Sequence, residues 1–173
     1  EAPRAVEAGA VVVDNSSAFR MDPDVPLVVP EVNGDVLETL DGPGIVANPN
    51  CSTIIALLAL TPIHRAAGVR RAIVSTYQAV SGAGAAWMDE LEQQARDFAA
   101  GTALTQSVTG RQLLFNVFSH DSAIGEDGSN EEEAKLVRET HRIWDDDTVA
   151  IAATCVRVPV LRAHAESIHL TLE

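Results

Sequence analysis

Segments with the alternation of a strand and segments with the periodicity of a helix follow one another along this chain, and their order constrains its fold more than any other feature. Strand patterns occupy residues 10–14, 44–47, 71–80, 149–160 and 168–172. Helical patterns occupy residues 1–8, 35–40, 52–67, 86–100 and 131–144. Because the two kinds of element are interleaved, the sequence predicts an α/β or α+β fold.

The segment at residues 52–67 is unusual because apolar residues occupy every side of the predicted helix. A helix that is apolar all round is normally buried all round, so we expect this one inside a core. Gly68 ends the helix, and Pro62 lies within it, where we expect a kink.

The charge balance excludes several kinds of partner. The chain carries 12 basic and 25 acidic residues, a net charge of -13. This charge repels phosphate backbones and anionic lipids, so we expect no nucleic-acid and no membrane partner. Two cysteines are too few for a disulfide framework, which favours a cytoplasmic protein. Any anionic ligand must be held by a local group of positive side chains.

Both ends of the sequence have the pattern of interrupted elements. Residues 1–8 have the pattern of the last turns of a helix closed by Gly9, and the alternating strand at residues 168–172 is followed by no turn. We therefore expect this sequence to be an internal piece of a longer chain.

Cys51 lies where a predicted strand turns into the apolar helix, in the segment NPNCST at residues 48–53. At a helix start, free backbone N–H groups and the positive end of the helix dipole favour a thiolate, which is a reactive nucleophile. The alternative is a small buried cysteine beside a capping asparagine. This segment alone does not decide between a nucleophilic and a structural cysteine.

Four separate segments in one order change that balance. They are DNSSAFRM at residues 14–21, NPNCST at 48–53, YQAVSGAG at 77–84, and CVRVPV at 155–160 followed by His164. Together they resemble bacterial-type aspartate-semialdehyde dehydrogenases, over essentially the whole chain. The resemblance implies the tail end of an NADP-binding Rossmann domain at residues 1–50. It also implies a catalytic and dimerisation domain at residues 51–173, with a mixed sheet like that of glyceraldehyde-3-phosphate dehydrogenase.

The activity that this resemblance implies is the NADP-dependent reductive dephosphorylation of L-aspartyl 4-phosphate to L-aspartate 4-semialdehyde, through a cysteine acyl-enzyme. Such an enzyme serves lysine, threonine, methionine and diaminopimelate biosynthesis, and is expected to be a cytoplasmic homodimer. The glycine-rich turn that binds the cofactor's pyrophosphate is absent from this sequence. We therefore expect this piece alone to bind NADP poorly and to be inactive.

The resemblance also assigns roles to individual residues. The catalytic residues would be Cys51 and His164, the latter moving a proton at the substrate oxygen. The substrate-binding residues would be Arg157, Glu132, Gln78, Arg20, Asn50 and Lys135. The cofactor-binding residues would be Asn15, Ser81, Gly82 and Gly84.

Local sequence alone offers simpler interpretations of several of these residues. His164 could be a solvated histidine beyond a strand end, Glu132 an ordinary acidic residue in a first helical turn, and Arg20 and Lys135 surface charges. We predict no metal site, because His164 and His169 lie at an odd spacing on a strand and point to opposite faces.

Two other functions remain as alternatives. One is a related acyl-phosphate reductase such as N-acetyl-glutamyl-phosphate reductase, whose acylated substrate has no ammonium group for Glu132 and which usually has glycine in place of Asn50. The other is a non-catalytic dimerisation module. Cys155, inside an apolar strand, is expected to be inert in either case.

Overall fold

The computed structural model describes residues 1–120 and 122–173. The chain divides into two compact units that are not contiguous in sequence. Unit 1 consists of residues Glu1–Ile73, Ala134–Ala152 and His169–Glu173, and unit 2 of Val74–Glu133 and Ala153–Ile168. The fold is α/β, as the alternating pattern predicts.

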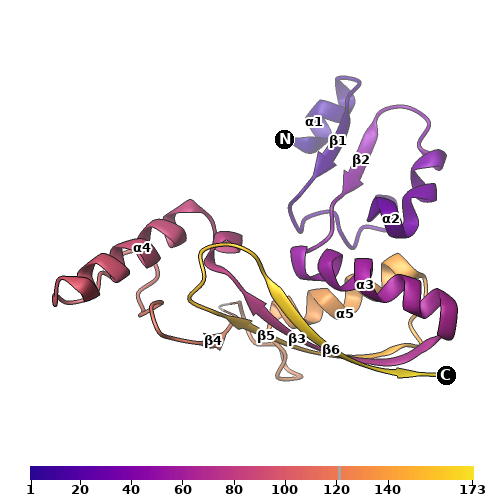
Figure 1. Ribbon diagram of the computed structural model, residues 1–173. Helices are drawn as coiled ribbons and strands as arrows, with labels where there is room; N and C mark the ends of the chain where they lie inside the picture. Colours follow the sequence, from indigo (N-terminus) through magenta and orange to yellow (C-terminus); the bar gives the residue numbers. More distant parts are fainter. Residues whose placement is uncertain (121) are drawn as a thin grey trace. The chain divides into compact units, whose positions relative to one another are not determined.

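Unit 1 begins with a short parallel sheet covered by helix α1 (Ala2–Glu7) (Figure 1). Strands β1 (Val11–Asp14) and β2 (Gly44–Ala47) pair in register from Val11 opposite Gly44 to Asp14 opposite Ala47. Gly9, at a φ of 92°, makes the turn between α1 and β1, which glycine adopts at little cost. These elements agree with the sequence prediction to within a residue or two.

Between β1 and β2 the chain forms a polar loop and two short helices, α2 (Pro30–Asn33) and the 3-10 helix η1 (Gly34–Thr39). The sequence predicts only the second of these. The first begins at Pro30, whose fixed φ and missing N–H suit a first helical position. A single turn is too short to produce a periodic pattern, so α2 was missed.

Helix α3 (Cys51–Ala67) follows β2 and contributes to the core of unit 1. Its buried residue Leu57 packs with residues from the loop, from β2 and from helix α5, namely Val25, Leu27, Val29, Val32, Ala47 and Ile143. The prediction of burial all round is wrong. Ile55, Leu58 and Ile63 are 40%, 44% and 39% exposed, because the described residues pack against only one side of this helix.

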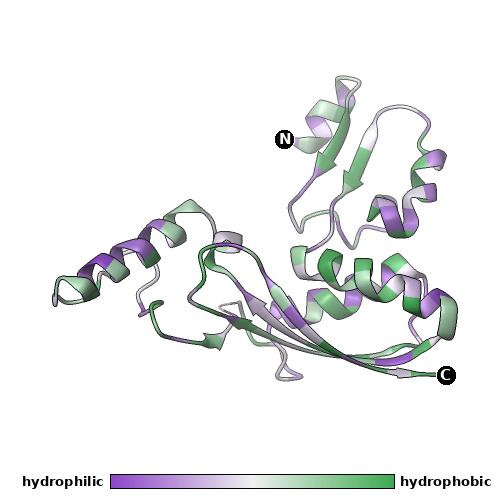
Figure 2. Ribbon diagram, in the orientation of Figure 1, coloured by the Kyte–Doolittle hydropathy of each residue, from purple (hydrophilic) through white to green (hydrophobic). Residues whose placement is uncertain are grey.

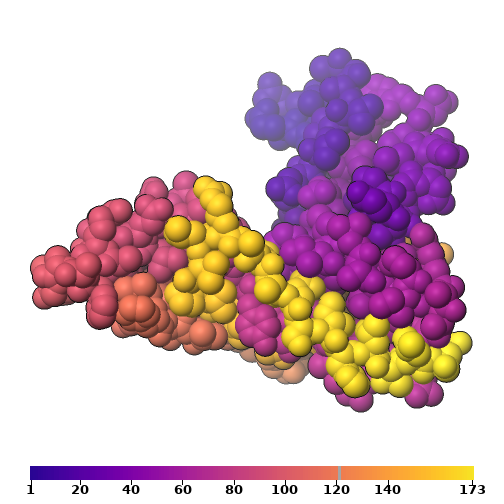
Figure 3. Space-filling model, in the orientation of Figure 1, coloured from indigo at the N-terminus to yellow at the C-terminus, as the bar shows by residue number. Residues whose placement is uncertain are grey.

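The second sheet has four strands in the order β4-β5-β3-β6, with β6 at an edge. Their bounds are Val69–Gln78 for β3, Phe118–Ser119 for β4, Ala150–Arg157 for β5 and Ala165–Leu172 for β6. Strands β4 and β5 are antiparallel, with Phe118 opposite Arg157 and Ser119 opposite Val156. No residue of β6 is fully buried, and this yellow segment is visible at the surface in Figure 3.

Unit 2 also contains the 3-10 helix η2 (Val80–Ala83) and helix α4 (Ala85–Ala99). Strand β3 ends at Gln78, two residues before the predicted end, because the chain turns into η2 at Val80. Helix α4 is amphipathic, with green and purple alternating along its ribbon in Figure 2. Its residue Leu91 packs with Val80 and Leu113 in a second core.

Two buried polar residues of α4 organise the long polar connector that follows it. Gln94 Oε1 accepts hydrogen bonds from the backbone N–H groups of Leu113 and Leu114 at 2.8 and 2.9 Å. Glu90 accepts hydrogen bonds from Val108 and Thr109. Burial alone would raise the pKa of Glu90, but these hydrogen bonds lower it below its ordinary value. The connector therefore has a defined course without forming long helices or strands.

Helix α5 (Glu131–Trp144) has the bounds and the buried stripe that the sequence predicts. Leu136, Thr140 and Ile143 are buried along this stripe, and Trp144 Nε1 donates to Thr61 Oγ1 at 2.9 Å.

Within the part of the chain that the structure describes, no helix combines the length and apolar character needed to cross a membrane.

Candidate functional site

Cys51 is the first residue of α3, which begins one residue before the predicted helix at residues 52–67, and its side chain is exposed. Asn50 caps the helix: its Oδ1 accepts hydrogen bonds from the N–H groups of Ser52 at 2.9 Å and Thr53 at 3.4 Å. The cap fixes the helix start, so the sulfur lies at the positive end of the helix dipole. An exposed thiol in this position suits a nucleophile better than a packing residue.

A buried ion pair holds the segment before Cys51 in place. Glu139, on α5, is 1% exposed and accepts a hydrogen bond from the backbone N–H of Asn50 at 2.6 Å. Its other carboxylate oxygen lies 3.1 Å from Nη1 of Arg20. Arg20 also donates from Nε to Asn48 O at 2.9 Å and from Nη2 to Asn15 O at 3.1 Å. The 14–21 segment and the helix start are thus joined within unit 1.

Unit 2 places His164 against the backbone of Ala79. The Ala79 N–H donates to His164 Nδ1 at 3.0 Å, so the neutral imidazole carries its proton on Nε2. Desolvation by burial and the positive charge of Arg157 lower the pKa of His164, which favours this neutral form at pH 7. The Nε2 atom therefore acts as a hydrogen-bond donor.

Arg157, the last residue of β5, is 3% exposed and lies beside His164. Its Nη1 donates to the carbonyl of Ala79 at 2.8 Å, and its Nη2 lies 3.0 Å from His120 Nε2. The guanidinium carbon is 5.4 Å from the centroid of the Trp87 ring, a cation–π distance. The backbone of Ala79 thus contacts the imidazole through its N–H and the guanidinium through its carbonyl.

Gln78 and Glu132 form a buried pair in the same unit. Gln78 Nε2 donates to Glu132 Oε1 at 3.0 Å, and the two side chains are 1% and 5% exposed. Glu132 lies in the first turn of α5, where Asn130 and Glu133 cap each other reciprocally, with N–H to side-chain oxygen distances of 2.9 Å in both directions. The capping box fixes the first turn of α5 and with it the direction in which the Glu132 side chain points.

The glycine segment after β3 lies next to these groups. A β-carbon on Gly82 would lie 3.3 Å from His164 Nε2 and 3.6 Å from Nη1 of Arg157. Gly84 has a φ of 102°, which a residue with a side chain rarely adopts. Glycine at 82 therefore keeps the approach to the imidazole and the guanidinium open.

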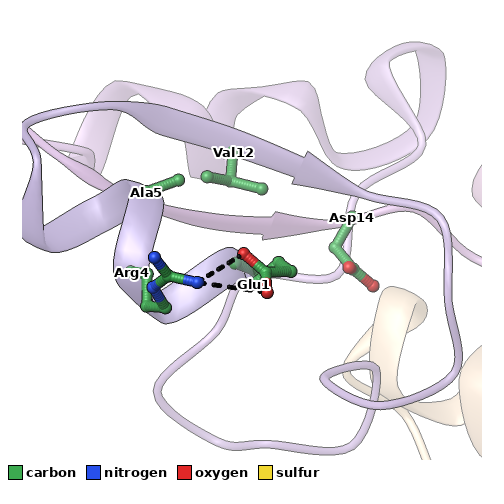
Figure 4. A pocket seen from close by; sticks show the side chains of 6 residues that line it. Glu1, Arg4, Ala5, Val12 and Asp14 are labelled. Atoms are coloured by element: carbon green, nitrogen blue, oxygen red, sulfur yellow. Dashed lines mark hydrogen bonds and ion pairs between the residues drawn. The ribbon is translucent and has the colours of Figure 1, made fainter.

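A separate shallow pocket lies in unit 1 between α1 and β1 (Figure 4). It is lined by Glu1, Ala2, Arg4, Ala5, Val12 and Asp14. The guanidinium of Arg4 is paired with Glu1 at 3.1 Å. None of the lining residues is among those predicted for the functional site.

Two family models match most of the chain. One, described as the dimerisation domain of semialdehyde dehydrogenase, matches residues 60–173, and the other, its NAD binding domain, matches residues 1–40. The chain belongs to the semialdehyde dehydrogenase family.

Relatives of this semialdehyde dehydrogenase chain include curated proteins and solved structures. It is 47% identical to an aspartate-semialdehyde dehydrogenase of Aquifex aeolicus over 99% of its own length and 51% of that protein. It is similar to the structure of aspartate semialdehyde dehydrogenase II from Vibrio cholerae complexed with ASA, with 44% identity and a TM-score of 0.93 over 99% of this chain and 51% of that one. A more distant match, at 26% identity and a TM-score of 0.70, is the Candida albicans enzyme with NADP, over 98% of this chain and 46% of that one. The chain spans about half the length of the curated relatives it matches.

The predicted site residues of this family member fall into two groups. In unit 1, hydrogen bonds connect Arg20, Asn15 and Asn50, the residue before Cys51, through Asn48 and Glu139. In unit 2, contacts connect Gln78 with Glu132, and His164 with Arg157 and Gly82. Lys135 is half-buried on α5 and belongs to unit 1, and Ser81 and Gly84 flank Gly82 in η2 and the turn that follows.

The structure adds two residues that the sequence analysis did not include, Glu139 and His120. Glu139 lies seven residues after Glu132 on α5, within the buried stripe, and a carboxylate on an apolar stripe indicates a buried cationic partner. That signal was present in the sequence. His120 lies in the polar connector, where no periodic pattern distinguishes it.

Proposed function

We propose that the full-length protein to which this chain belongs catalyses the reductive dephosphorylation of L-aspartyl 4-phosphate to L-aspartate 4-semialdehyde. The observation that carries this proposal is Cys51, exposed at the capped start of α3, in a chain related at 47% identity to an aspartate-semialdehyde dehydrogenase. The pathways served would be lysine, threonine, methionine and diaminopimelate biosynthesis, in the cytoplasm.

In the proposed mechanism, the Cys51 thiolate attacks the carbonyl carbon of the acyl phosphate. A C–S bond forms, the C–O bond to phosphate breaks, and phosphate leaves with its electron pair, which yields a thioester. Reduction of the thioester gives a hemithioacetal, whose C–S bond breaks to release the aldehyde and regenerate the thiolate. His164, with its proton on Nε2, would donate a hydrogen bond to the oxygen that gains negative charge in these steps.

The substrate's charged groups would be recognised by complementary side chains. Arg157 offers a planar fork of donors for the α-carboxylate, and Glu132, oriented by Gln78, a carboxylate for the α-ammonium. For phosphate we propose Arg20, Lys135 and Asn50. Arg20 uses three of its five N–H donors in its contacts with Asn48, Glu139 and Asn15, which leaves two for an anion.

The nicotinamide cofactor that we propose is NADP, held on this part of the protein by Asn15, Ser81, Gly82 and Gly84. Gly82 and Gly84 are exposed and present no side chain, which suits the close approach of a flat ring to the backbone. When bound, the cofactor supplies the hydride. A model of an NAD binding domain matches residues 1–40, which supports a nicotinamide cofactor.

We further propose that residues 1–50 complete the cofactor domain and that residues 51–173 form the catalytic and dimerisation domain of a homodimer. The match of residues 60–173 to a dimerisation domain supports this division. The partly exposed edge strand β6 offers a backbone that a second copy could approach.

The test uses the full-length protein in the reverse direction. We expect NADP reduction with aspartate semialdehyde only when phosphate or arsenate is present, because the thioester must be cleaved by an oxyanion. Cys51→Ala should lower kcat by at least about 1,000-fold, whereas the matched variant Cys155→Ala should keep activity. Turnover without phosphate would contradict the acyl-phosphate chemistry, and a preference for N-acetyl-glutamate semialdehyde would favour the related reductase.

A further inference from the structure

We infer that His120 is a positioning residue that orients the guanidinium of Arg157 and, through Ser122, joins it to Glu132. This inference rests on the proposed function, in which Arg157 and Glu132 bind opposite charges on the same substrate carbon. It assigns a role to a histidine that is not among the site residues predicted from the sequence.

The backbone holds His120 beside Arg157. Strand β4 pairs with β5 with Phe118 opposite Arg157, and the backbone N–H of His120 donates to the carbonyl of Cys155 at 2.9 Å. His120 therefore continues the β4–β5 ladder by one residue. From this position its Nε2 lies 3.0 Å from Nη2 of Arg157.

The chemistry of the two side chains fixes the protonation state of His120. A guanidinium can only donate hydrogen bonds, so His120 Nε2 must accept and the imidazole must be neutral. The remaining ring proton lies on Nδ1, which faces Ser122 Oγ at 3.2 Å. A neutral acceptor orients the guanidinium without neutralising it, whereas a carboxylate at this position would compete with a carboxylate ligand.

Ser122 extends the contact to the backbone of Glu132. Its Oγ accepts a hydrogen bond from the backbone N–H of Glu132 at 3.3 Å as well as facing His120 Nδ1. Glu132 in turn accepts from Gln78. Hydrogen bonds thus run from the Arg157 guanidinium through His120 and Ser122 to the backbone N–H of Glu132, the residue whose carboxylate we propose for the ammonium group. Displacing His120 should loosen the recognition of substrate more than the chemistry at Cys51.

The experiment compares His120→Leu with His120→Gln in the full-length protein. Leucine has a similar size but no acceptor, so we expect KM for aspartate semialdehyde to rise at least about 10-fold while kcat changes by less than about threefold. Glutamine can accept from Arg157 through Oε1 and donate from Nε2, so its KM should stay within about threefold of the parent value. Ser122→Ala removes the second contact and should raise KM in the same direction by a smaller factor.

A second substrate separates positioning from a general structural effect. With 3-aminopropanal, which lacks the α-carboxylate, His120→Leu and the parent protein should have the same kcat/KM. In an Arg157→Leu background, adding His120→Leu should cause no further loss, because the group to be oriented is gone. A drop of kcat without a rise of KM, or an equal loss with both substrates, would overturn the inference.

Failure of this inference differs from failure of the proposed function. If the parent protein does not reduce NADP with aspartate semialdehyde and phosphate, the proposed function is wrong. If the parent is active and His120→Leu has the parent KM, only the role of His120 is wrong. Thermal melting of each variant checks folding, and Ser122→Ala provides the test if His120→Leu does not fold.

Discussion

The two cysteines of this chain lie in opposite chemical environments. Cys51 is exposed at the amino terminus of a helix, whereas Cys155 is fully buried in β5. Burial raises the pKa of the Cys155 thiol to about 11, and the charges of Glu132 and Glu133 act in the same direction. At neutral pH the thiolate of Cys155 is therefore rare and out of reach of reagents.

This contrast predicts selective labelling. With iodoacetamide at pH 7 the folded protein should be modified at Cys51 faster than at Cys155 by at least about 100-fold, because only the thiolate is nucleophilic and only Cys51 is accessible. Peptide mass spectrometry over a time course measures both rates. The difference should vanish in denaturant, and equal slow labelling of both cysteines in the folded protein would favour a non-catalytic module.

At the scale of elements, the start of α3 depends on one side chain. Asn50 Oδ1 accepts hydrogen bonds from the N–H groups of Ser52 and Thr53. The backbone N–H of Asn50 donates a hydrogen bond to Glu139. Shortening the side chain removes both hydrogen bonds to Oδ1 and leaves the backbone hydrogen bond to Glu139 in place. The cap can therefore be tested while the buried ion pair of Glu139 remains.

Asn50→Ala should lower the free energy of unfolding by about 1 kcal/mol through loss of the cap. It should also slow the reaction of Cys51 with iodoacetamide, since the helix start becomes less ordered. Asn50→Asp keeps an acceptor, so stability should change little, but its negative charge beside the sulfur disfavours the thiolate and should slow labelling. Urea unfolding and the labelling rate are measured on both variants. Unchanged labelling in both would show that the helix start does not activate Cys51.

The sequence was sufficient to predict elements whose patterns are long, and insufficient where a contact in space decides. The bounds of β2 and α5 agree with the predictions, because a clear apolar pattern ends at a turn or a cap in each. Strand β4 has two residues, Phe118 and Ser119, and is defined by its pairing with β5 rather than by any local pattern. The exposure of Ile55 and Leu58 was not predictable, because it depends on which side of α3 finds a packing partner.

The same distinction applies to the candidate site. Motifs pointed to Cys51, Arg157 and Gln78. In the structure Cys51 begins α3, Arg157 donates a hydrogen bond to Ala79 and Gln78 donates one to Glu132. The bond from Ala79 to Nδ1 of His164 joins residues 85 positions apart, so the tautomer of the imidazole could not be read from the sequence. The contact of His120 with Arg157 joins residues 37 positions apart and could not be predicted from the sequence either.

At the scale of the whole molecule, acidic groups outnumber basic ones and give a net charge of -13. Burial disfavours the charged form of one of these acidic groups. Glu166 lies on β6, and both of its carboxylate oxygens are buried without a hydrogen-bond partner among the described residues. Desolvation raises its pKa from the ordinary 4.5 to about 7. The native state therefore binds a proton here that the unfolded chain has already lost between these two pH values.

This coupling predicts how stability depends on pH. Because the native pKa of Glu166 is raised, its stabilising contribution is complete below pH 4.5 and is lost as the pH rises through about 7. Glu166→Gln, which cannot ionise, should match the parent near pH 4.5 and exceed its free energy of unfolding at pH 8 by on the order of 2 kcal/mol. Urea unfolding of the full-length protein at both pH values measures this difference, with Glu38→Gln on the exposed surface as a control that should change stability by less than about 0.5 kcal/mol at either pH. If Glu166→Gln instead destabilises the protein at pH 8, the Glu166 carboxylate is charged and paired with a cationic group of the full-length protein.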